Sequence, residues 1–371
     1  MKELFDDERR KLARKYNNKK RKYSWIIKSI QIIFWIIFLG FSLEYKLYQI
    51  LSEINNQEII LVFYLIFFLL IYSLINWTAS YFLIYRLNKK YDLSNQKTDS
   101  WWKDKGKEFL LNIIMVYLTS RLFLYLINKW PDKWWMYFSI VGTIFYIIIT
   151  FIMPYVILPL FYKLEKYPDN SLRKRLVDFI RKNGIAIEDI YEINLSSKIN
   201  YANAAVIGLG SSRKIILGDN LTDNYTEKEI VAILAHELGH HLHKDIIKNL
   251  LLRSSILFVS AYIISKIWYN IIEYTGYLTT EIYTLPLLFL IWSIVFLIFM
   301  PLELYVSRKL ENKADNFALN RIDCPEDLGS GLAKLADQSL SELDYGLFET
   351  LFKASHPSIG ERVKKSLNWN K

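Results

Sequence analysis

The sequence predicts an all-α polytopic membrane protein, with six or seven transmembrane helices, that carries a mixed α+β domain outside the membrane. Two observations lead to this fold class. Long uncharged runs of aliphatic and aromatic residues recur along the 371 residues, and each of them can cross about 30 Å of hydrocarbon as a helix. Outside these runs, residues 226–245 place several metal-binding side chains at helical spacing.

Six apolar runs are the predicted spans. They comprise residues 25–43, 59–85, 109–128, 134–162, 250–269 and 285–302. Pro154 and Pro159 lie near the end of the fourth run and predict a kink there, because proline cannot donate the helical hydrogen bond. Four charged residues lie within or near the ends of the runs: Lys28, Arg121, Arg253 and Lys266. Charges at membrane depth pair, snorkel or line water, so a water-filled chamber between the spans is one hypothesis for them.

The net charge of +10 is distributed unevenly between the two sides of the predicted bundle. Ten lysines and arginines precede residue 25 and seven lie in residues 86–107, whereas the opposite loops contain only Lys46, Lys129 and Lys133. This positive-inside asymmetry predicts that both termini and the metal-binding region are cytoplasmic. The membrane would be the inner membrane of a prokaryotic cell or the endoplasmic reticulum of a eukaryotic one. We therefore expect membrane lipids, and no nucleic acid, as partners of the basic segments.

The spans divide the chain into five parts. These are a basic cytoplasmic N-terminus (1–24), four transmembrane helices (25–162), a cytoplasmic catalytic part (163–249), two transmembrane helices (250–302) and a second cytoplasmic part (303–371). The single cysteine, Cys324, excludes an intramolecular disulfide and a cysteine-based metal site.

The first cytoplasmic part predicts one amphipathic helix followed by short strands. The helix covers residues 171–183, and the strands cover residues 192–196, 204–209 and 214–217. Gly208, Gly210 and Ser211-Ser212 predict the turn of a hairpin between the last two strands. A glycine-rich nucleotide loop is the alternative interpretation of GLGSSRK, but the segment has neither a third glycine nor a Walker lysine-serine pair.

A helix with metal-ligand spacing follows these strands. Thr226 and Glu229 have capping-box spacing, so we expect the helix to begin at Glu227 and to continue into the fifth span. His236 and His240 are four residues apart on one face, and Glu237 can reach a metal-bound water as general base. Four of the five histidines of the chain lie in residues 236–243. The alternative is a charged surface helix with incidental histidines, but this clustering favours the HExxH arrangement of a zincin-like domain.

A catalytic zinc usually has three protein ligands, and Glu311 is the predicted third one. Glu311 and Asp315 are four residues apart on a helix that emerges from the sixth span. Asp315 can then accept the N–H of a ligand histidine and fix its tautomer. The alternative is an exposed ion-pair ladder of these carboxylates with Arg308, Lys309 and Lys313. We predict one Zn²⁺ per chain, bound by His236, His240 and Glu311.

Three motifs together resemble one protease group. HELGH at 236–240, SRKLENKAD from Ser307 and HPSIGER from His356 resemble the integral-membrane gluzincins. That group includes the type 1 CAAX prenyl proteases and the bacterial heat-stress membrane proteases. YANAAVIGLGSSRKIILGDNL from Tyr201 resembles the CAAX prenyl protease branch in particular. The resemblance covers about residues 85–367, and it implies seven spans, one more than the six apolar runs.

The resemblance also implies roles for individual residues. His236, His240 and Glu311 would bind zinc, and Glu237 would be the general base. Asn203 and Ala204 match the edge of the substrate-binding strand, which holds an extended peptide by β-addition. His356 and Arg362 match the tail motif that stabilises the oxyanion and orders the site. Ser358 and Glu361 also form a capping box, so a plain helix start is the alternative for this tail. His241 and His243 match no motif.

These observations predict a zinc-dependent membrane endopeptidase of the CAAX prenyl protease type, acting on peptide or protein substrates with or without a prenyl group. One alternative is a protease for quality control of membrane proteins. An alternative of another class is a zinc-binding membrane scaffold without useful catalysis, against which the intact Glu237 argues. A transporter is disfavoured because all histidines lie outside the predicted spans.

Overall fold

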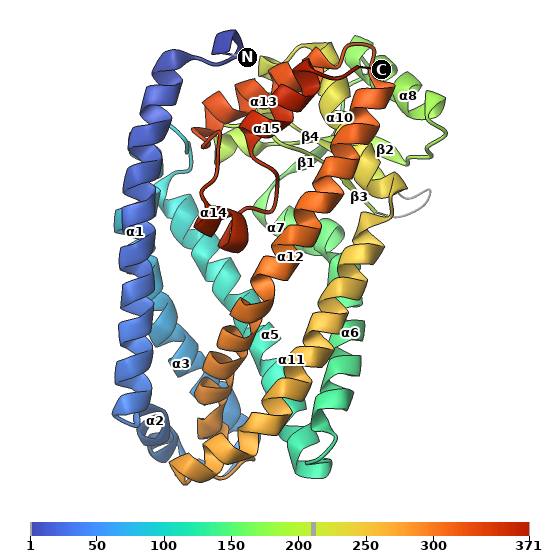
Figure 1. Ribbon diagram of the computed structural model, residues 1–371. Helices are drawn as coiled ribbons and strands as arrows, with labels where there is room; N and C mark the ends of the chain where they lie inside the picture. Colours follow the sequence, from blue (N-terminus) through green and yellow to red (C-terminus); the bar gives the residue numbers. More distant parts are fainter. Residues whose placement is uncertain (1, 209–212, 371) are drawn as a thin grey trace.

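The computed structural model describes residues 2–208 and 213–370. Long helices form a bundle in the lower part of Figure 1, and a small sheet with shorter helices lies together at its upper end. Both termini lie at this upper end, beside the sheet-containing part. The predicted combination of a helical membrane bundle with a mixed α+β part is therefore confirmed.

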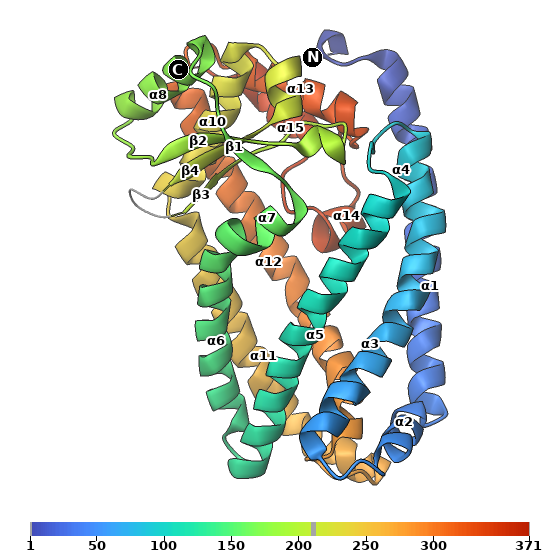
Figure 2. The same ribbon diagram turned by 180° about the vertical axis from the view of Figure 1, so that it is seen from behind.

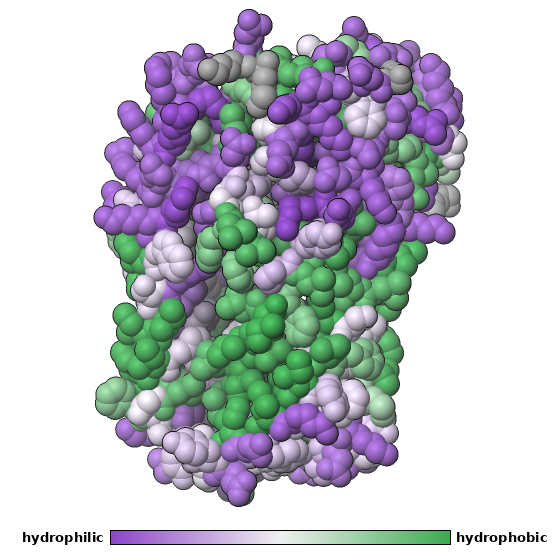
Figure 3. Space-filling view, viewed as in Figure 1, coloured by the Kyte–Doolittle hydropathy of each residue, from purple (hydrophilic) through white to green (hydrophobic). Residues whose placement is uncertain are grey.

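Six helices of the described residues are long and apolar enough to cross a membrane, which confirms the predicted number of apolar spans. They comprise α1 (Asp7–Gly40), α3 with η2 and α4 (Gln57–Ser80, Tyr81–Tyr85, Arg86–Lys90), α5 (Thr98–Lys129), α6 with η3 and α7 (Trp134–Ile152, Met153–Ile157, Leu158–Phe161), α11 (Asp245–Thr275) and η6 with α12 (Ile282–Thr284, Leu285–Arg321). A further short helix, α2 (Leu43–Leu51), joins the first two. Figure 3 shows the apolar belt over these helices, with hydrophilic surface above and below it.

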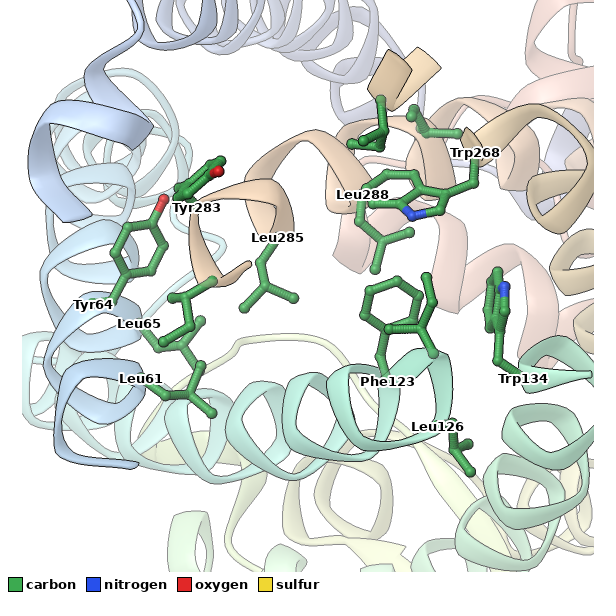
Figure 4. Packing of buried hydrophobic residues seen from close by; sticks show 14 of the residues in the cluster. Leu61, Tyr64, Leu65, Phe123, Leu126, Trp134, Trp268, Tyr283, Leu285 and Leu288 are labelled. Atoms are coloured by element: carbon green, nitrogen blue, oxygen red, sulfur yellow. The ribbon is translucent and has the colours of Figure 1, made fainter. Parts of the chain in front are cut away.

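Large aromatic side chains hold the spans together at the end remote from the sheet (Figure 4). Phe123 of α5 packs edge-on against Trp134 of α6 and Trp268 of α11, with ring centroids 5.1 and 5.8 Å apart. All three side chains are buried. Because lipid tails are as apolar as these residues, such close contacts rather than hydrophobic transfer stabilise the bundle.

The kink predicted at Pro154 is present as a change of helix type. The α-helical hydrogen bonds of α6 end at Ile152, and residues Met153–Ile157 form a π-helical turn with proline at its start. This turn accommodates a residue without an N–H, as expected for proline inside a helix.

The basic N-terminal segment is part of the first long helix. Arg9 and Arg10 lie near the start of α1 and donate hydrogen bonds to carbonyls at the end of α13 (Glu326–Ser339), including those of Ala336 and Asp337. Arg10 also pairs with the Asp337 carboxylate at 2.5 Å. Cationic side chains at the last carbonyls of a helix are favourable, so α1 is fastened to the α+β part as well as to the bundle.

Four strands form one mixed sheet in the order β1-β2-β4-β3. The strands are β1 (Leu164–Lys166), β2 (Asp189–Ile193), β3 (Ala204–Ile207) and β4 (Lys214–Gly218), and only the β2–β4 pair is parallel. The predicted hairpin of β3 and β4 is confirmed, and Gly208 has a φ of +83° that suits glycine. Leu209, Gly210, Ser211 and Ser212, predicted for the strand end and the turn, lie outside the described residues.

The strand predicted at residues 192–196 is wrong by three positions. β2 ends at Ile193, and Leu195–Ser197 forms a 3-10 turn, η4. The polar groups here have other partners, because Asp219 accepts the Ser196 amide and hydroxyl. Side chains that bond neighbouring backbone in this way compete with strand pairing.

The predicted amphipathic helix is present as α8 (Ser171–Lys182), and it packs Leu172, Leu176 and Ile180 against the sheet. An ion pair holds its first turn: Arg173 Nη2 lies 2.5 Å from Asp189 Oδ1 on β2. Partial burial raises the pKa of Asp189, but hydrogen bonds from Arg173, the Ile190 amide and Lys166 outweigh it and lower the pKa to about 2.

The low pKa of Asp189 predicts that the protein loses stability in acid. Since the folded pKa lies below the unfolded one, the contribution of Asp189, at most about 2.5 kcal/mol, is complete above pH 5 and disappears as the pH falls from 4 to 2. The unfolding temperature of Asp189→Asn should therefore lie below that of the wild type at pH 7, and the two should converge at low pH. Thermal unfolding followed by tryptophan fluorescence in detergent measures this, and a gap that does not change with pH would contradict it.

The metal-binding helix does not continue into the fifth span, contrary to the sequence prediction. α10 (Glu227–Leu242) ends at His243, and Lys244 has a φ of +56° before α11 begins at Asp245. A residue in the left-handed region stops the helical hydrogen-bond ladder and redirects the chain. The axes of α10 and α11 therefore differ in direction in Figure 1.

Each of the four charged residues of the spans has a neighbouring side chain as a partner: the arginines pair with carboxylates of other helices, and the lysines lie over aromatic rings of their own helix. Arg121 lies 2.6 Å from Glu58, and Arg253 lies 2.5 Å from Glu303. The ammonium groups of Lys28 and Lys266 lie over the rings of Trp25 and Tyr262. None of the four lines the large cavity beside the metal-binding helix, which is described below. Arg121 lines a different cavity, of about 520 Å³, at the opposite end of the bundle.

Candidate metal centre

Helix α10 is fixed at its start by a complete capping box. The Glu229 amide donates to Thr226 Oγ1 at 3.3 Å, and the Thr226 amide donates to Glu229 Oε2 at 2.8 Å. The buried Glu229 carboxylate also accepts bonds from Ser330 and Lys334 of α13. The same group therefore caps α10 and ties it to the neighbouring helix.

Gly239, inside the HELGH segment, allows α10 to approach α12 closely. A Cβ atom at this position would lie 2.9 Å from the Ala314 Cα atom and 3.1 Å from its carbonyl oxygen. Only glycine permits this backbone contact without a shift of one helix. The close approach places Glu311 and Asp315 of α12 beside the histidines of α10.

His236, His240 and Glu311 converge at one point, with one ligand atom of each within 4.8 Å of the others. His236 Nε2 lies 3.2 Å from Glu311 Oε2, His240 Nε2 lies 3.3 Å from Glu311 Oε1, and the two Nε2 atoms are 3.3 Å apart. His236 and Glu311 are buried, and His240 is partly exposed.

Both histidines are held by a carboxylate on their other ring nitrogen. His236 Nδ1 lies 2.8 Å from Asp315 Oδ1, and His240 Nδ1 lies 3.0 Å from Asp245 Oδ2. When Nδ1–H donates to the carboxylate, Nε2 presents its lone pair. This hydrogen-bond pattern therefore directs both Nε2 atoms, as acceptors, at the Glu311 carboxylate.

This donor set fits a metal ion. Glu311 Oε2 is buried and accepts no hydrogen bond, and two imidazole lone pairs beside a carboxylate repel each other unless a cation lies between them. Burial lowers the pKa of His236, but the Asp315 and Glu311 carboxylates outweigh it and raise the pKa to about 9, so positive charge is favoured here. Two nitrogens and one carboxylate form a set consistent with zinc.

Asp315 is itself paired with a buried arginine. Arg362 Nε and Nη2 donate to the two oxygens of Asp315 at 2.9 and 2.7 Å. Arg362 lies on α15 (Ile359–Leu367), so this pair joins the C-terminal helix to α12 and, through His236, to α10.

His356 lies in the segment between α14 (Leu347–Phe352) and α15. Its Nε2 lies 3.1 Å from Glu311 Oε1, and half of its side chain is exposed. The Ser358 side chain accepts the Glu361 amide, so the tail motif also caps α15. The predicted catalytic role of this motif therefore concerns His356, whereas the predicted helix start concerns Ser358 and Glu361. The two interpretations are compatible.

A cavity of about 140 Å³ brings the remaining predicted residues together. Its walls include Asn203, Ala204, His236, Glu237, His356 and Arg362. Ala204 is the first residue of β3, which is the edge strand of the sheet. Burial raises the pKa of Glu237 above its ordinary value, and the charges of His236 and His240 offset this rise only in part. The Glu237 carboxylate, the start of the edge strand and the candidate metal ligand His236 therefore face one small space.

A larger cavity of about 920 Å³ adjoins this space and shares Asn203, His356 and Arg362 with it. Aromatic and aliphatic side chains, among them Ile84, Trp101, Phe161 and Leu335, line it together with polar ones. Its lining residues come from α1, the α4–α5 region and the α+β part. The cavity therefore extends between the bundle and the metal centre.

Two residues near the site have roles that the sequence prediction missed. Asp245 holds His240, and also accepts a bond from Lys248 at 2.9 Å. His241 Nε2 bonds the Val206 carbonyl of β3 at 2.7 Å, and burial lowers its pKa, so it is a neutral donor that fastens the edge strand to α10. His243 lies against the ring of Phe317. A carboxylate five residues after the second histidine was the signal for Asp245, but it reaches His240 only because α10 ends first.

Comparisons with known proteins show what the chain is similar to. A model of peptidase family M48 matches residues 166–370, and a model of the N-terminal part of CAAX prenyl proteases, described as five membrane helices, matches residues 1–163. The described residues of the latter range contain four candidate spans and the short α2.

Individual relatives extend these matches. The chain is 29% identical over 285 residues to the uncharacterized metalloprotease YhfN of Bacillus subtilis (strain 168), covering 76% of this chain and 67% of that protein. It is 25% identical over 390 residues to CAAX prenyl protease 1 of Saccharomyces cerevisiae, covering 96% of this chain and 85% of that protein. The crystal structure of S. mikatae Ste24p has the same fold, with a TM-score of 0.85 at 21% identity over 99% of this chain and 91% of that one.

The M48 model spans more than half of the chain and includes the HELGH segment, Glu311 and the tail motif. The metal-ligand cluster lies inside the matched range, and the candidate spans account for the membrane part. The chain is an integral, multi-pass membrane metalloprotease that belongs to peptidase family M48.

Proposed function

We propose that the chain is a zinc-dependent endopeptidase of the CAAX prenyl protease type, with one Zn²⁺ held by His236, His240 and Glu311. The observation that carries the proposal is the convergence of these three ligands next to Glu237, which lines a small cavity together with His236. This small cavity shares wall residues with a larger one that reaches the membrane helices. The similarity to yeast CAAX prenyl protease 1 over 96% of the chain supports the substrate class.

The geometry supports a defined role for each residue. When bound by these ligands, zinc would supply Lewis acidity and lower the pKa of a water molecule towards about 7. Glu237 would take the proton of the attacking water and return it to the leaving amine. His356, half-exposed at the cavity, would donate a hydrogen bond to the developing oxyanion. Arg362 binds both oxygens of Asp315 through Nε and Nη2, so we assign it to positioning His236 through that carboxylate.

The peptide would bind along β3. Asn203 and Ala204 line the small cavity beside Glu237, and an edge strand offers unpaired backbone groups to an extended peptide. The aromatic and aliphatic side chains in the walls of the 920 Å³ cavity would contact a lipid or apolar side chains of the substrate. A quality-control protease would use the same machinery on unlipidated segments.

Two peptides distinguish these functions. Detergent-purified wild type and Glu237→Gln are incubated with a farnesylated CAAX peptide and with the same peptide without its lipid. We expect cleavage by the wild type alone and a strong preference for the lipidated peptide. Equal cleavage of both peptides would favour the quality-control function. If the wild type cleaves no faster than the variant, the result would favour a zinc-binding scaffold without catalysis.

We also propose that the metal centre faces the cytoplasm. The basic residues of α1 and of residues 86–107 lie at the same end of the bundle as the sheet, which agrees with the positive-inside rule. In intact cells, a membrane-impermeant maleimide should label Asn55→Cys, in the loop at the far end, and not Lys364→Cys, both in a Cys324→Ala background. Labelling of Lys364→Cys alone would show that the metal centre faces the opposite side of the membrane.

A further inference from the structure

The segment that carries His356 has no helix or strand of its own. It links α14 to α15, and the His356 ring contacts Ser355 Oγ at 2.8 Å and Glu311 Oε1 at 3.1 Å. A half-exposed side chain on such a link keeps its position only if the backbone around it is fixed. A residue that anchors the backbone close to His356 is therefore required to hold the imidazole in place.

Arg308 is that anchor. It lies on α12 and its Nη1 atom donates to the carbonyls of Thr350 and Ala354, at 2.6 and 2.7 Å. Thr350 belongs to α14, and Ala354, which is buried, is two residues before His356. Hydrogen bonds from a charged donor are about twice as strong as neutral ones. One guanidinium therefore holds both the end of α14 and the segment that follows it.

The contacts of α14 with α1 do not replace this anchor. Arg21 lies 3.6 Å from Glu349, and the Trp25 ring lies 5.9 Å from that of Phe348. These contacts hold the first turn of α14, which lies between α1 and α12 in Figure 1, but they end seven residues before His356. Arg308 reaches past α14 to Ala354.

The position of Arg308 on its helix connects it to the metal centre. Arg308, Glu311 and Asp315 are three and four residues apart, so they share one face of α12. Glu311 is a metal-ligand candidate, Asp315 holds His236, and Arg308 holds the segment of His356. We infer that Arg308 is a positioning residue that sets the distance of His356 from the metal centre. The inference rests on the proposed role of His356.

Hydrogen exchange tests the positioning without any reference to activity. Arg308→Met keeps the apolar stem of the side chain and removes its donors, so amides of residues 351–356 should exchange at least 10-fold faster than in the wild type. Lys309→Met is the matched control, since Lys309 is exposed and lies over the Tyr305 ring, and it should leave exchange unchanged. Unchanged exchange in Arg308→Met would overturn the inference. If that variant fails to fold, Arg308→Lys, which can reach one carbonyl, should show intermediate exchange.

Turnover then separates positioning from general stability. A misplacement of about 1 Å costs up to about 100-fold in rate, so Arg308→Met should lower kcat by 10- to 100-fold, with KM and metal content unchanged. In a His356→Ala background the same substitution should lower kcat no further. Additive losses would show that Arg308 acts independently of His356 and would overturn the inference. If His356→Ala alone leaves kcat unchanged, the proposed role of His356 fails, and hydrogen exchange still decides whether Arg308 fixes the segment.

Discussion

Replacing Glu237 with glutamine should lower the turnover number for peptide hydrolysis by about 10²–10⁴-fold, the usual contribution of a general acid–base group. Glu237 lines the small cavity next to His236, while the proposed metal ligands are His236, His240 and Glu311. The amide has nearly the shape of the carboxylate but cannot accept the proton of the attacking water. The loss should therefore fall on kcat, with the metal content unchanged at one ion per chain.

Two measurements make this expectation specific. Elemental analysis of the purified variant should show the same metal content as the wild type, and peptide affinity should change little. Glu227→Gln, on the first turn of the same helix, is the matched control, because its carboxylate bonds Ser171 and Arg175 far from the cavity. Full activity of Glu237→Gln would exclude Glu237 as the base. Absence of hydrolysis by the wild type as well would favour the scaffold interpretation.

Replacing Arg362 with methionine should destabilise the protein by about 3–5 kcal/mol, the typical cost of breaking a buried ion pair from one side. The Asp315 side chain is 1% exposed and would retain its charge without its bidentate partner. Since Asp315 also holds His236, we expect weaker metal binding in addition. Thermal unfolding in detergent, with and without added zinc, measures both effects.

A double-mutant cycle isolates the pair from the packing of α15. Asp315→Asn combined with Arg362→Met should cost less than the sum of the two single substitutions, because neither residue then leaves an unpaired buried charge. Lys364→Met, exposed on the same helix, should change the unfolding temperature little. Additive effects of the two buried substitutions would show that Asp315 and Arg362 are not energetically coupled, and would contradict the stabilising role of this pair.

Much of the architecture follows from local sequence patterns. Long apolar runs predict the six candidate spans, because an isolated helix in lipid must satisfy its own backbone and needs no tertiary partner to be recognised. The start of α10 at Glu227 follows from the capping box of Thr226 and Glu229, which acts over three residues. The histidine pair on one helix face follows from helical spacing alone.

The tertiary structure decided where helices stop and which distant groups meet. The sequence predicted one continuous helix from α10 into α11, and this error hid Asp245, whose contact with His240 depends on the left-handed turn at Lys244. The predicted strand at 192–196 was displaced because Asp219, more than twenty residues away, binds the backbone of Ser196.

The same division applies to the metal centre. The sequence by itself determined its ligand types, their spacing on each helix and the membrane setting, since these depend on residues within one or two helical turns. Only the tertiary structure decided that Gly239 brings α10 against Ala314, that Arg362 pairs with Asp315 and that Arg308 holds the segment of His356. Such contacts join residues far apart in the chain, and their geometry depends on how whole helices pack rather than on any local pattern.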